Sequence, residues 1–363
     1  MKLSSKFTNL GSLLLCLLYY LFRGRAKKIT SNPKRILILR WKPHMGDVVY
    51  ITPMFRAIKT RYPDSRLYVI GAGRVEEVIR HNPDIDKYIN YENNFWTVVK
   101  LLKKEKIDFA CLANLGSTMG FALLYLAGIK TISTFSLESG KGDTSVSYSI
   151  LKTFAITSPF YTGQYVPPQY LKLLEPINAN TGDAHFRLYF SKEAENKINN
   201  VFTQNNMSVD DFIVAFAPGG AVPERWWPAE RFAELAKFFY EEQNAKILLV
   251  GAGKDEGPIT AMLAVLDGVP AVNLLNQNLD EFKAAISKCD LVIGNDSGPM
   301  VTADAFDVAN LVLVGPTDER EYHRPPGSLN RVLKGTDGDV KNITLDMAKK
   351  EIDVILSNLN KKG

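Results

Sequence analysis

An acidic residue stands directly behind a glycine, at a point where a parallel strand is expected to pass into a helix. It is Asp47, in the segment HMGDVVYITP that follows the apolar run RILILR. Open α/β sheets bind their ligands at the carboxyl ends of such strands. A carboxylate there can act as a general base toward a substrate hydroxyl, or it can cap the following helix. Asp47 is therefore a candidate catalytic residue.

Two glycines and an arginine follow a second apolar run. APGGAVPERWWPAERF places Gly219 and Gly220 after the expected strand FIVAF, and Arg225 just before two tryptophans. Backbone N–H groups of a glycine turn can form an anion-binding nest, and a guanidinium binds phosphate oxygens in a bidentate manner. The alternative for the arginine is a surface side chain stacked on Trp226. For Trp227 we favour a place in the hydrophobic core under the helix.

A third motif, GNDSGPM, lies between the apolar run DLVI and a helical pattern. Asp296 or Ser297 can cap that helix, and Gly298 lets a ligand approach the backbone. The N–H groups at a helix start carry the positive end of its dipole and suit a phosphate. Taken alone, the motif is explained equally well by a plain helix cap.

Spacing argues against several other kinds of site. GAGRVE and GAGKDEG each follow an expected strand, but neither has the third glycine of G-x-G-x-x-G in place, which disfavours a redox dinucleotide enzyme. GNDSG is not the G-x-S-x-G of a nucleophile elbow. The three cysteines and four histidines are scattered, which disfavours a metal site and favours a reducing compartment. No basic face that would bind nucleic acid stands out.

The amino-terminal segment differs from the rest of the chain. Much of the positive excess behind the net charge of +5 precedes residue 36, and residues 10–22, LGSLLLCLLYYLF, are almost all apolar. This run is shorter than the ~20 apolar residues of a membrane span, and no small-residue cleavage site follows it. We expect residues 1–30 to associate with the membrane surface. Packing of this helix on the protein itself is the alternative.

The elements that position these residues alternate between strand and helix. A chain of 363 residues with 46% hydrophobic residues is long enough for two domains. Short apolar runs predict buried parallel strands, and the segments between them have helical spacing. Prolines and glycines at 140–182 predict loops and crossing helices. Strands are expected at 35–40, 66–72, 108–115, 130–136, 212–220, 246–253, 271–276, 290–296 and 310–316, and helices at 48–62, 74–81, 95–106, 123–128, 191–206, 227–243, 255–266, 279–289, 297–307 and 344–359.

These elements predict an α/β protein with two Rossmann-like domains that face each other across a cleft. We place a membrane-associating segment at 1–33, the N-terminal Rossmann-like domain at 34–182 and the C-terminal Rossmann-like domain at 183–345. A last helix, at 346–363, is expected to pack back on one of the halves.

Together the three motifs resemble a known family. HMGDVVYITPMFRAIKTRYPDS, PGGAVPERWWPAERFAELA and GNDSGPMVTADAF, in this order, look like glycosyltransferase family 9, the lipopolysaccharide heptosyltransferases and their relatives. The resemblance extends from Arg35 to the last helix. It implies a GT-B-type fold, with an acceptor domain at 34–182 and a nucleotide-sugar donor domain at 183–345. It also implies an ADP-heptose-like nucleotide-sugar as co-substrate, inversion at the anomeric carbon, and no metal or other cofactor.

The resemblance also assigns roles to residues. It implies that Asp47 is the catalytic base. His44 stands where the family usually has a serine, and Val301 stands where it usually has a histidine near the donor phosphates. With the motif reasoning above, it places the donor diphosphate at Gly219, Gly220, Arg225, Ser297 and Gly298, the nucleotide and ribose at Asp296 and at Asp255 or Glu256, and the acceptor side at Lys42 and His44.

The predicted function is transfer of a heptose or related sugar to a lipid-linked or cell-envelope glycan. We expect the enzyme to be cytoplasmic and peripheral at the inner face of the cytoplasmic membrane. The alternatives are a catalytically impaired nucleotide-sugar-binding protein of the same fold, or another GT-B-like enzyme such as a nucleotide-sugar epimerase. Asp47 separates the transferase from the nucleotide-sugar-binding protein, because a protein that only binds has no need of a base.

Overall fold

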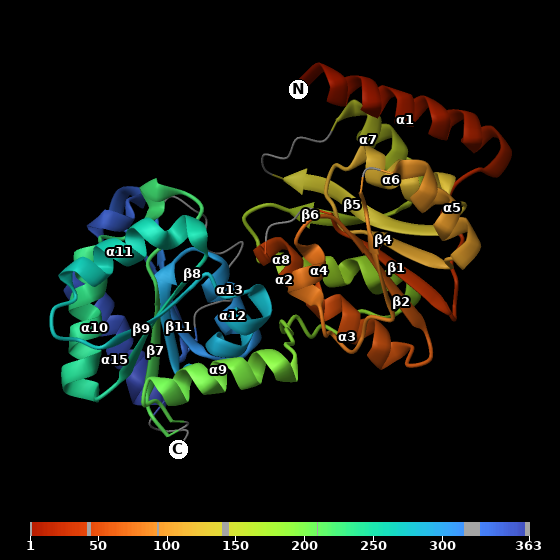
Figure 1. Cartoon of the computed structure of the whole chain (residues 1–363). Helices are drawn as coiled ribbons and strands as arrows, with labels where there is room; N and C mark the ends of the chain where they lie inside the picture. The colour runs from red at the N-terminus through yellow and green to blue at the C-terminus, as the bar shows by residue number, and fades with distance from the viewer. Residues whose placement is uncertain are drawn as a thin grey trace. The chain divides into compact units, whose positions relative to one another are not determined.

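The computed structural model describes residues 2–41, 45–92, 94–139, 145–208, 210–315 and 327–359, with the backbone alone at 2–8 and 139 (Figure 1). The chain divides into two compact units, Met1–His185 and Phe186–Gly363. The boundary expected from the sequence lay between residues 182 and 183. Each unit has its own parallel sheet and hydrophobic core, which confirms the prediction of an α/β protein with two such domains.

The first unit contains a six-stranded sheet in the order β3-β2-β1-β4-β5-β6, and every described strand pair is parallel. The strand order reverses between β1 and β4, and such a reversal is where open α/β sheets bind ligands. The strands are β1 (Arg35–Leu39), β2 (Arg66–Gly71), β3 (Lys87–Asn90), β4 (Phe109–Leu112), β5 (Thr131–Ser139) and β6 (Ile156–Tyr161).

Helices cover both faces of this sheet. Figure 1 shows α1, α5, α6 and α7 on one face and α2, α3, α4 and α8 on the other. The helices are α1 (Lys2–Arg23), α2 (Met45–Val49), α3 (Thr52–Arg61), α4 (Val75–Ile79), α5 (Phe95–Glu105), α6 (Thr118–Leu126), α7 (Val146–Leu151) and α8 (Val166–Leu171), with 3₁₀ turns η1 (Lys152–Phe154) and η2 (Lys172–Ile177). None of the helices in the described ranges is both long and apolar enough to cross a bilayer.

The second unit repeats this topology. Its parallel sheet has the order β12-β11-β10-β7-β8-β9, so β7 and β10 flank the reversal as β1 and β4 do. The strands are β7 (Ile213–Ala217), β8 (Lys246–Gly251), β9 (Ala271–Leu275), β10 (Leu291–Asn295), β11 (Ala309–Val314) and β12 (Asn330–Lys334).

The helices of the second unit also form two layers (Figure 1). They are α9 (Lys192–Gln204), α10 (Ala229–Gln243), α11 (Glu256–Val265), α12 (Leu279–Ile286), α13 (Gly298–Ala305) and α15 (Leu345–Leu359), with 3₁₀ turns η3 (Pro223–Arg225), η4 (Gly253–Asp255), η5 (Thr336–Gly338) and η6 (Val340–Asn342). The last helix, α15, packs with Ala348, Ile352 and Ile355 into the core of this unit. Its packing on one of the halves was predicted and is confirmed.

Two expectations about elements were wrong. The helix expected at 48–62 is divided into α2 and α3, because Pro53 stands in the first turn of α3, where its missing N–H is tolerated. The strands β3, β6 and β12 were not predicted. All three are edge strands, and each is only partly buried, so its sequence lacks a continuous apolar run.

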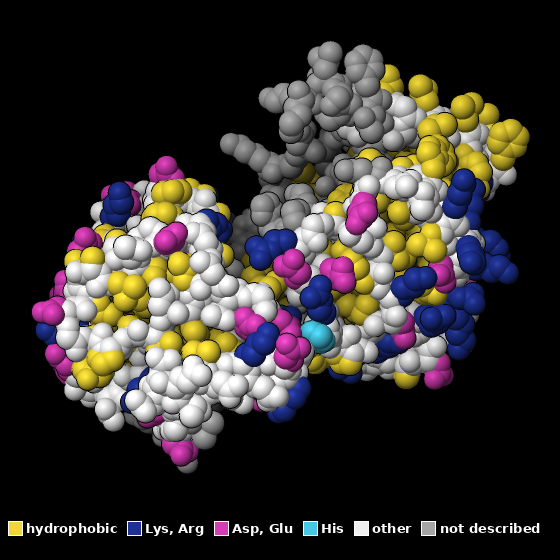
Figure 2. Space-filling model, in the orientation of Figure 1, with side chains coloured by type: hydrophobic (Ala, Val, Ile, Leu, Met, Phe, Trp, Pro, Cys, Tyr) yellow, Lys and Arg dark blue, Asp and Glu magenta, His cyan; other side chains and the backbone are white. Residues whose placement is uncertain are grey.

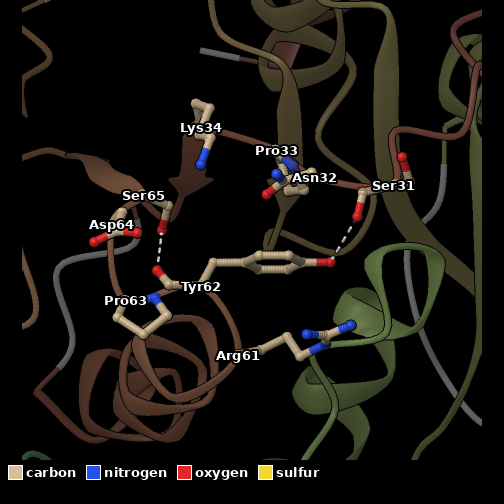
Figure 3. Close-up of a pocket in the computed structure, with 9 residues that line it drawn as sticks. All are labelled: Ser31, Asn32, Pro33, Lys34, Arg61, Tyr62, Pro63, Asp64 and Ser65. Carbon is tan, nitrogen blue, oxygen red and sulfur yellow. Dashed lines mark hydrogen bonds between the residues drawn. The ribbon is translucent and has the colours of Figure 1, made fainter.

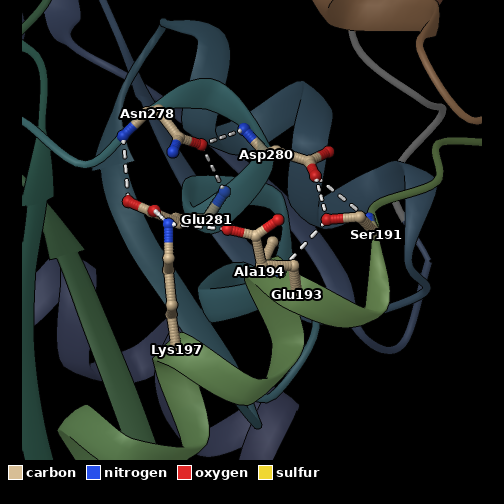
Figure 4. Close-up of polar contacts among 7 residues, drawn as sticks. All are labelled: Ser191, Glu193, Ala194, Lys197, Asn278, Asp280 and Glu281. Atoms are coloured by element: carbon tan, nitrogen blue, oxygen red, sulfur yellow. Dashed lines mark hydrogen bonds and ion pairs between the residues drawn. The ribbon is translucent and has the colours of Figure 1, made fainter.

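A polar network joins α9 to α12 in the second unit (Figure 4). The Asp280 Oδ2 atom accepts hydrogen bonds from the Ser191 hydroxyl at 2.7 Å and the Ser191 N–H at 3.0 Å. The Lys283 ammonium lies 3.1 Å from Asp280 Oδ1 and donates to the Tyr189 carbonyl oxygen at 2.6 Å. Lys283 is completely buried. Ser191 also caps α9 by accepting from the Ala194 N–H at 3.1 Å.

Asp280→Asn is expected to destabilise the second unit by about 2 kcal/mol, because the buried Lys283 loses its counter-charge. This expected loss of stability is smaller than for a fully buried pair, since the Asp280 side chain is 19% exposed. Burial alone would raise the pKa of Asp280, but the hydrogen bonds from Ser191 and the Lys283 charge outweigh it and lower that pKa below 3.8. The stabilisation is thus present above the unfolded-state pKa and lost as the pH falls through the lower folded-state value.

The measurement is urea-dependent hydrogen exchange of the α9 and α12 amides in the intact chain, at neutral and at acidic pH. The matched control is Lys197→Met, which removes a half-exposed ammonium that pairs with Glu193 and with Glu281, next to Asp280 in sequence. It is expected to change the urea midpoint of exchange by much less than Asp280→Asn does. A difference between wild type and Asp280→Asn that does not diminish as the pH falls through the range in which Asp280 becomes protonated would contradict the electrostatic explanation.

Candidate active site

The Asp47 carboxylate lies in α2, at the strand-order reversal of the first unit. Its Oδ1 atom is 2.8 Å from the Nη2 atom of Arg40, the residue that follows β1. The Arg40 side chain is 5% exposed and the Asp47 side chain 26% exposed. The carboxylate is therefore accessible to a ligand, while its cationic partner is nearly buried.

Two elements besides α2 hold Arg40 in place. Its Nη1 atom donates to the Ala113 carbonyl oxygen at 2.5 Å and to the Tyr170 hydroxyl oxygen at 2.7 Å. The guanidinium also lies 5.4 Å from the centre of the Tyr170 ring. Ala113 follows β4, and Tyr170 belongs to α8. The carboxylate is thus oriented by an arginine that is itself fixed.

The sequence interpretation missed Arg40. The signal that could have found it is an arginine directly after an apolar strand. A guanidinium at a buried strand end needs a partner of opposite charge, and Asp47 is the first acidic residue of the chain. Lys42 and His44, which were predicted on the acceptor side, lie outside the described residues and remain predictions.

A buried asparagine joins the loops at the strand-order reversal of each unit. In the first unit the Asn114 Oδ1 atom accepts from the Trp41 N–H at 3.1 Å. In the second unit Asn295 accepts from the Trp227 N–H at 2.9 Å and donates to the Pro218 carbonyl oxygen at 2.7 Å. Neither asparagine was singled out from the sequence. Their role is to fix the loops that carry the candidate residues.

The glycines after β7 are tied to Asp255. The Gly220 N–H donates to Asp255 Oδ1 at 2.9 Å, and the Ala252 N–H donates to Asp255 Oδ2 at 2.9 Å. A Cβ atom on Gly219 would lie 2.3 Å from Asp255 Oδ1, so no larger residue fits there. Asp255 is buried and holds the loops after β7 and β8 together, whereas Glu256 is exposed. Of the two carboxylates proposed for the ribose, Glu256 is the more accessible.

The third motif lies beside these glycines. Ser297 is the N-cap residue of α13, but its hydroxyl donates to the Asn295 carbonyl oxygen at 2.9 Å instead of accepting from the helix. A Cβ atom on Gly220 would lie 3.8 Å from the Ser297 Cβ atom. Pro299 has no N–H group, and the Met300 N–H donates to the Ser297 carbonyl oxygen at 3.2 Å, so the Gly298 N–H is the group at the start of α13 that can bind an anion.

The basic residue near these glycines and Ser297 is Arg225, in η3. Its Nη1 atom is 4.0 Å from Asp296 Oδ2, and the Arg225 side chain is 39% exposed. The structure therefore groups five of the predicted donor-side residues at the strand-order reversal of the second unit, namely Gly219, Gly220, Arg225, Asp296 and Ser297.

Two neighbouring side chains belong to the interior. Trp227 is buried, donates from Nε1 to the Ile343 carbonyl oxygen at 2.8 Å and packs edge-on against Phe232. Its predicted place in the core is confirmed. Val301, in α13, is also buried. Val301, one of the two departures from the family pattern, thus contributes to packing.

A hollow of about 330 Å³ opens at the other end of the first sheet (Figure 3). It is lined by residues that precede β1 and β2, including Lys34, Arg61 and Tyr62. Because these are the amino ends of parallel strands, the hollow lies away from the edge where such sheets bind ligands. None of the predicted site residues lines it.

Across the described ranges, no three His, Cys, Asp or Glu side chains are grouped as a metal site requires.

Known proteins resemble this chain in sequence and in fold. Lipooligosaccharide heptosyltransferase 2 of Campylobacter jejuni is 25% identical over 285 residues, which cover 75% of this chain and 79% of that protein. The structure of a family 9 glycosyl transferase from Veillonella parvula has a TM-score of 0.75 at 20% identity, covering 92% of this chain and 99% of the other. The E. coli ADP-heptose LPS heptosyltransferase II has a TM-score of 0.71 at 20% identity, with 89% and 99% covered.

The sequence also matches a model built for a whole protein family. The model for glycosyltransferase family 9 (heptosyltransferase) matches residues 147–343, more than half of the chain. This segment contains every predicted donor-side residue, and Asp47 lies before it. The sequence match and the shared fold together establish that this chain belongs to glycosyltransferase family 9 and is a glycosyltransferase.

Proposed function

We propose that the enzyme moves a heptose or related sugar from a nucleoside diphosphate donor to a hydroxyl of a lipid-linked or cell-envelope glycan, with inversion at the anomeric carbon. The names of the similar proteins support ADP-heptose as the donor type and lipopolysaccharide synthesis as the process. The observation that carries the proposal is the partly exposed Asp47 carboxylate, held 2.8 Å from the nearly buried Arg40 in a member of this family.

Asp47 acts on the acceptor. Its Oδ1 atom faces Arg40, so Oδ2 is the oxygen that takes the proton from the acceptor hydroxyl. The acceptor oxygen forms a bond to the anomeric carbon as the bond from that carbon to the diphosphate breaks. Attack from the face opposite the leaving group inverts the configuration.

The second unit acts on the leaving group. Negative charge accumulates on the diphosphate as the sugar departs, and the Arg225 guanidinium, the Gly298 N–H and the positive end of the α13 dipole stabilise it. The Gly220 N–H is used by Asp255, so the turn at Gly219 and Gly220 contributes space for the phosphates and not an N–H donor from Gly220. Asp255 holds that turn in place, and in this proposal Asp296 and Glu256 contact the nucleotide and its ribose. In this proposal a cation and backbone dipoles supply the stabilisation for which other transferases use a metal.

The experiment is a thermal-shift panel of ADP-, GDP-, UDP- and dTDP-sugars, followed by product analysis with the donor that raises the melting temperature most. Formation of a glycoside of inverted configuration supports the proposal. A donor that stabilises the protein but is never consumed indicates a binding protein. Conversion of the donor sugar to its epimer without an acceptor indicates an epimerase.

Arg225→Ala is expected to weaken binding of the nucleoside diphosphate about tenfold, because one charge-assisted contact to the diphosphate is lost. The measurement is isothermal titration calorimetry with the diphosphate that the panel selects. Arg74→Ala, which removes an exposed arginine of the first unit, is the matched control and should bind as wild type does. Unchanged affinity in Arg225→Ala would remove Arg225 from the site.

A further inference from the structure

Helix α1 has two apolar faces that point in opposite directions. Leu13 and Cys16 are buried, and Tyr19 and Tyr20 pack partly buried in the core shared with α6 and α7. At 3.6 residues per turn, Leu14, Leu18 and Leu21 recur on the other side of the helix. Their exposed fractions are 53%, 62% and 76%, and that of Phe22 is 89%. Leu10, Val146 of α7 and Ile150 of α7 are also exposed.

The orientation of this helix is fixed at its carboxyl end. The Arg23 guanidinium donates to the carbonyl oxygens of Tyr125 and Ile129 and lies 4.6 Å from the centre of the Tyr125 ring. Gly24 then turns the chain with a φ of +72°, and the Ala26 N–H donates to the Phe154 carbonyl oxygen at 2.7 Å. The outer face of α1 therefore cannot rotate into the core of its own unit.

Positive charge adjoins this outer face. No Asp or Glu precedes Asp47 in the sequence. Arg25, Lys27 and Lys28 are exposed just after the helix. Figure 2 shows the hydrophobic side chains along α1 with Lys and Arg side chains close by. Apolar side chains flanked by cations match the acyl boundary and the anionic headgroups of a lipid surface.

We propose that the outer face of α1, defined by Leu10, Leu14, Leu18, Leu21 and Phe22, docks the first unit flat on an anionic bilayer, with Arg25, Lys27 and Lys28 among the headgroups. The opposite face is part of the protein core, so lipid contacts one side of the helix only. A second copy of the chain is a poorer occupant, because it would bring two sets of cations together. This inference builds on the proposed function, since it supplies the surface on which a lipid-linked acceptor is met.

The experiment is co-sedimentation of the full chain with vesicles of phosphatidylethanolamine and phosphatidylglycerol, without donor or acceptor. We expect binding that weakens in high salt and is much weaker on phosphatidylcholine vesicles. Leu14→Ser/Leu18→Ser should lower the partition coefficient at least about tenfold, because two leucines leave the interface. The matched control is Leu263→Ser/Val265→Ser, which changes two exposed apolar residues of α11 and should bind as wild type does.

A separate measurement shows that the variant still folds. The three cysteines are free and buried, so a thiol reagent should react slowly with the native double variant if α1 stays docked at Cys16. No binding to anionic vesicles, or equal binding of Leu14→Ser/Leu18→Ser and wild type, would overturn the proposal. So would self-association through this face, seen as a dimer that the double variant loses. Vesicle binding without sugar transfer would instead refute the proposed function alone.

Discussion

Asp47→Asn is expected to lower kcat for sugar transfer about 10³-fold, because a general base contributes on the order of 10²–10⁴ to the rate. Asparagine keeps the size of the side chain and an oxygen that can face Arg40, but it cannot accept the proton of the acceptor hydroxyl. The measurement is steady-state transfer with the donor that the thermal-shift panel selects. The affinity for that donor should stay within a few-fold of the wild-type value.

The control for this substitution is Asp64→Asn, which changes an exposed aspartate beside the hollow at the other end of the same sheet. It should retain wild-type turnover. Normal turnover in Asp47→Asn would mean that another group is the base. A large loss of donor affinity would mean that Asp47 acts in binding.

Arg40→Met is expected to lower kcat about 10²-fold, equivalent to about 2.7 kcal/mol in the activation barrier. Methionine fills most of the space beside Tyr170, but it cannot bridge Asp47, Ala113 and Tyr170 as the guanidinium does. The carboxylate then samples orientations in which it does not face the acceptor. Arg40 is a positioning residue in this account, so KM for the donor should change little while kcat falls.

A double-mutant cycle separates this role from a general loss of structure. If Arg40 acts through Asp47, Arg40→Met/Asp47→Asn should be no slower than Asp47→Asn alone. Tyr170→Phe removes one acceptor of the guanidinium and should cost only a few-fold in kcat. Multiplicative effects in the double variant, or a lowered melting temperature that accounts for the loss, would show that Arg40 does not act through Asp47.

The central strands of both sheets could be predicted from the sequence because they are buried on both faces. β1, β4, β7 and β10 each appear as a short apolar run, and the candidate motifs follow three of them. The edge strands β3, β6 and β12 escaped prediction, because strands that pair on one side only, with partly exposed side chains, carry polar residues. A run of apolar residues indicates a buried strand, and side chains become less buried toward the edge of a sheet.

The position of the candidate residues at strand ends was likewise determined by local sequence, whereas their partners were decided by tertiary contacts. Nothing near Asp47 in sequence indicates that Arg40 reaches Ala113 and Tyr170, which lie 73 and 130 residues away along the chain. The same holds for Asp255, whose carboxylate is occupied by the N–H of Gly220.

Helix α1 follows the same rule. Its composition shows an apolar helix, but only packing against Tyr125 and Phe154 decides which leucines are left outside. Sequence alone determined the order of the central strands and the loops that carry chemistry, because short-range periodicity and turn residues encode them. The tertiary structure decided which charge faces which carboxylate and which apolar face stays exposed, because those choices depend on groups brought together by folding.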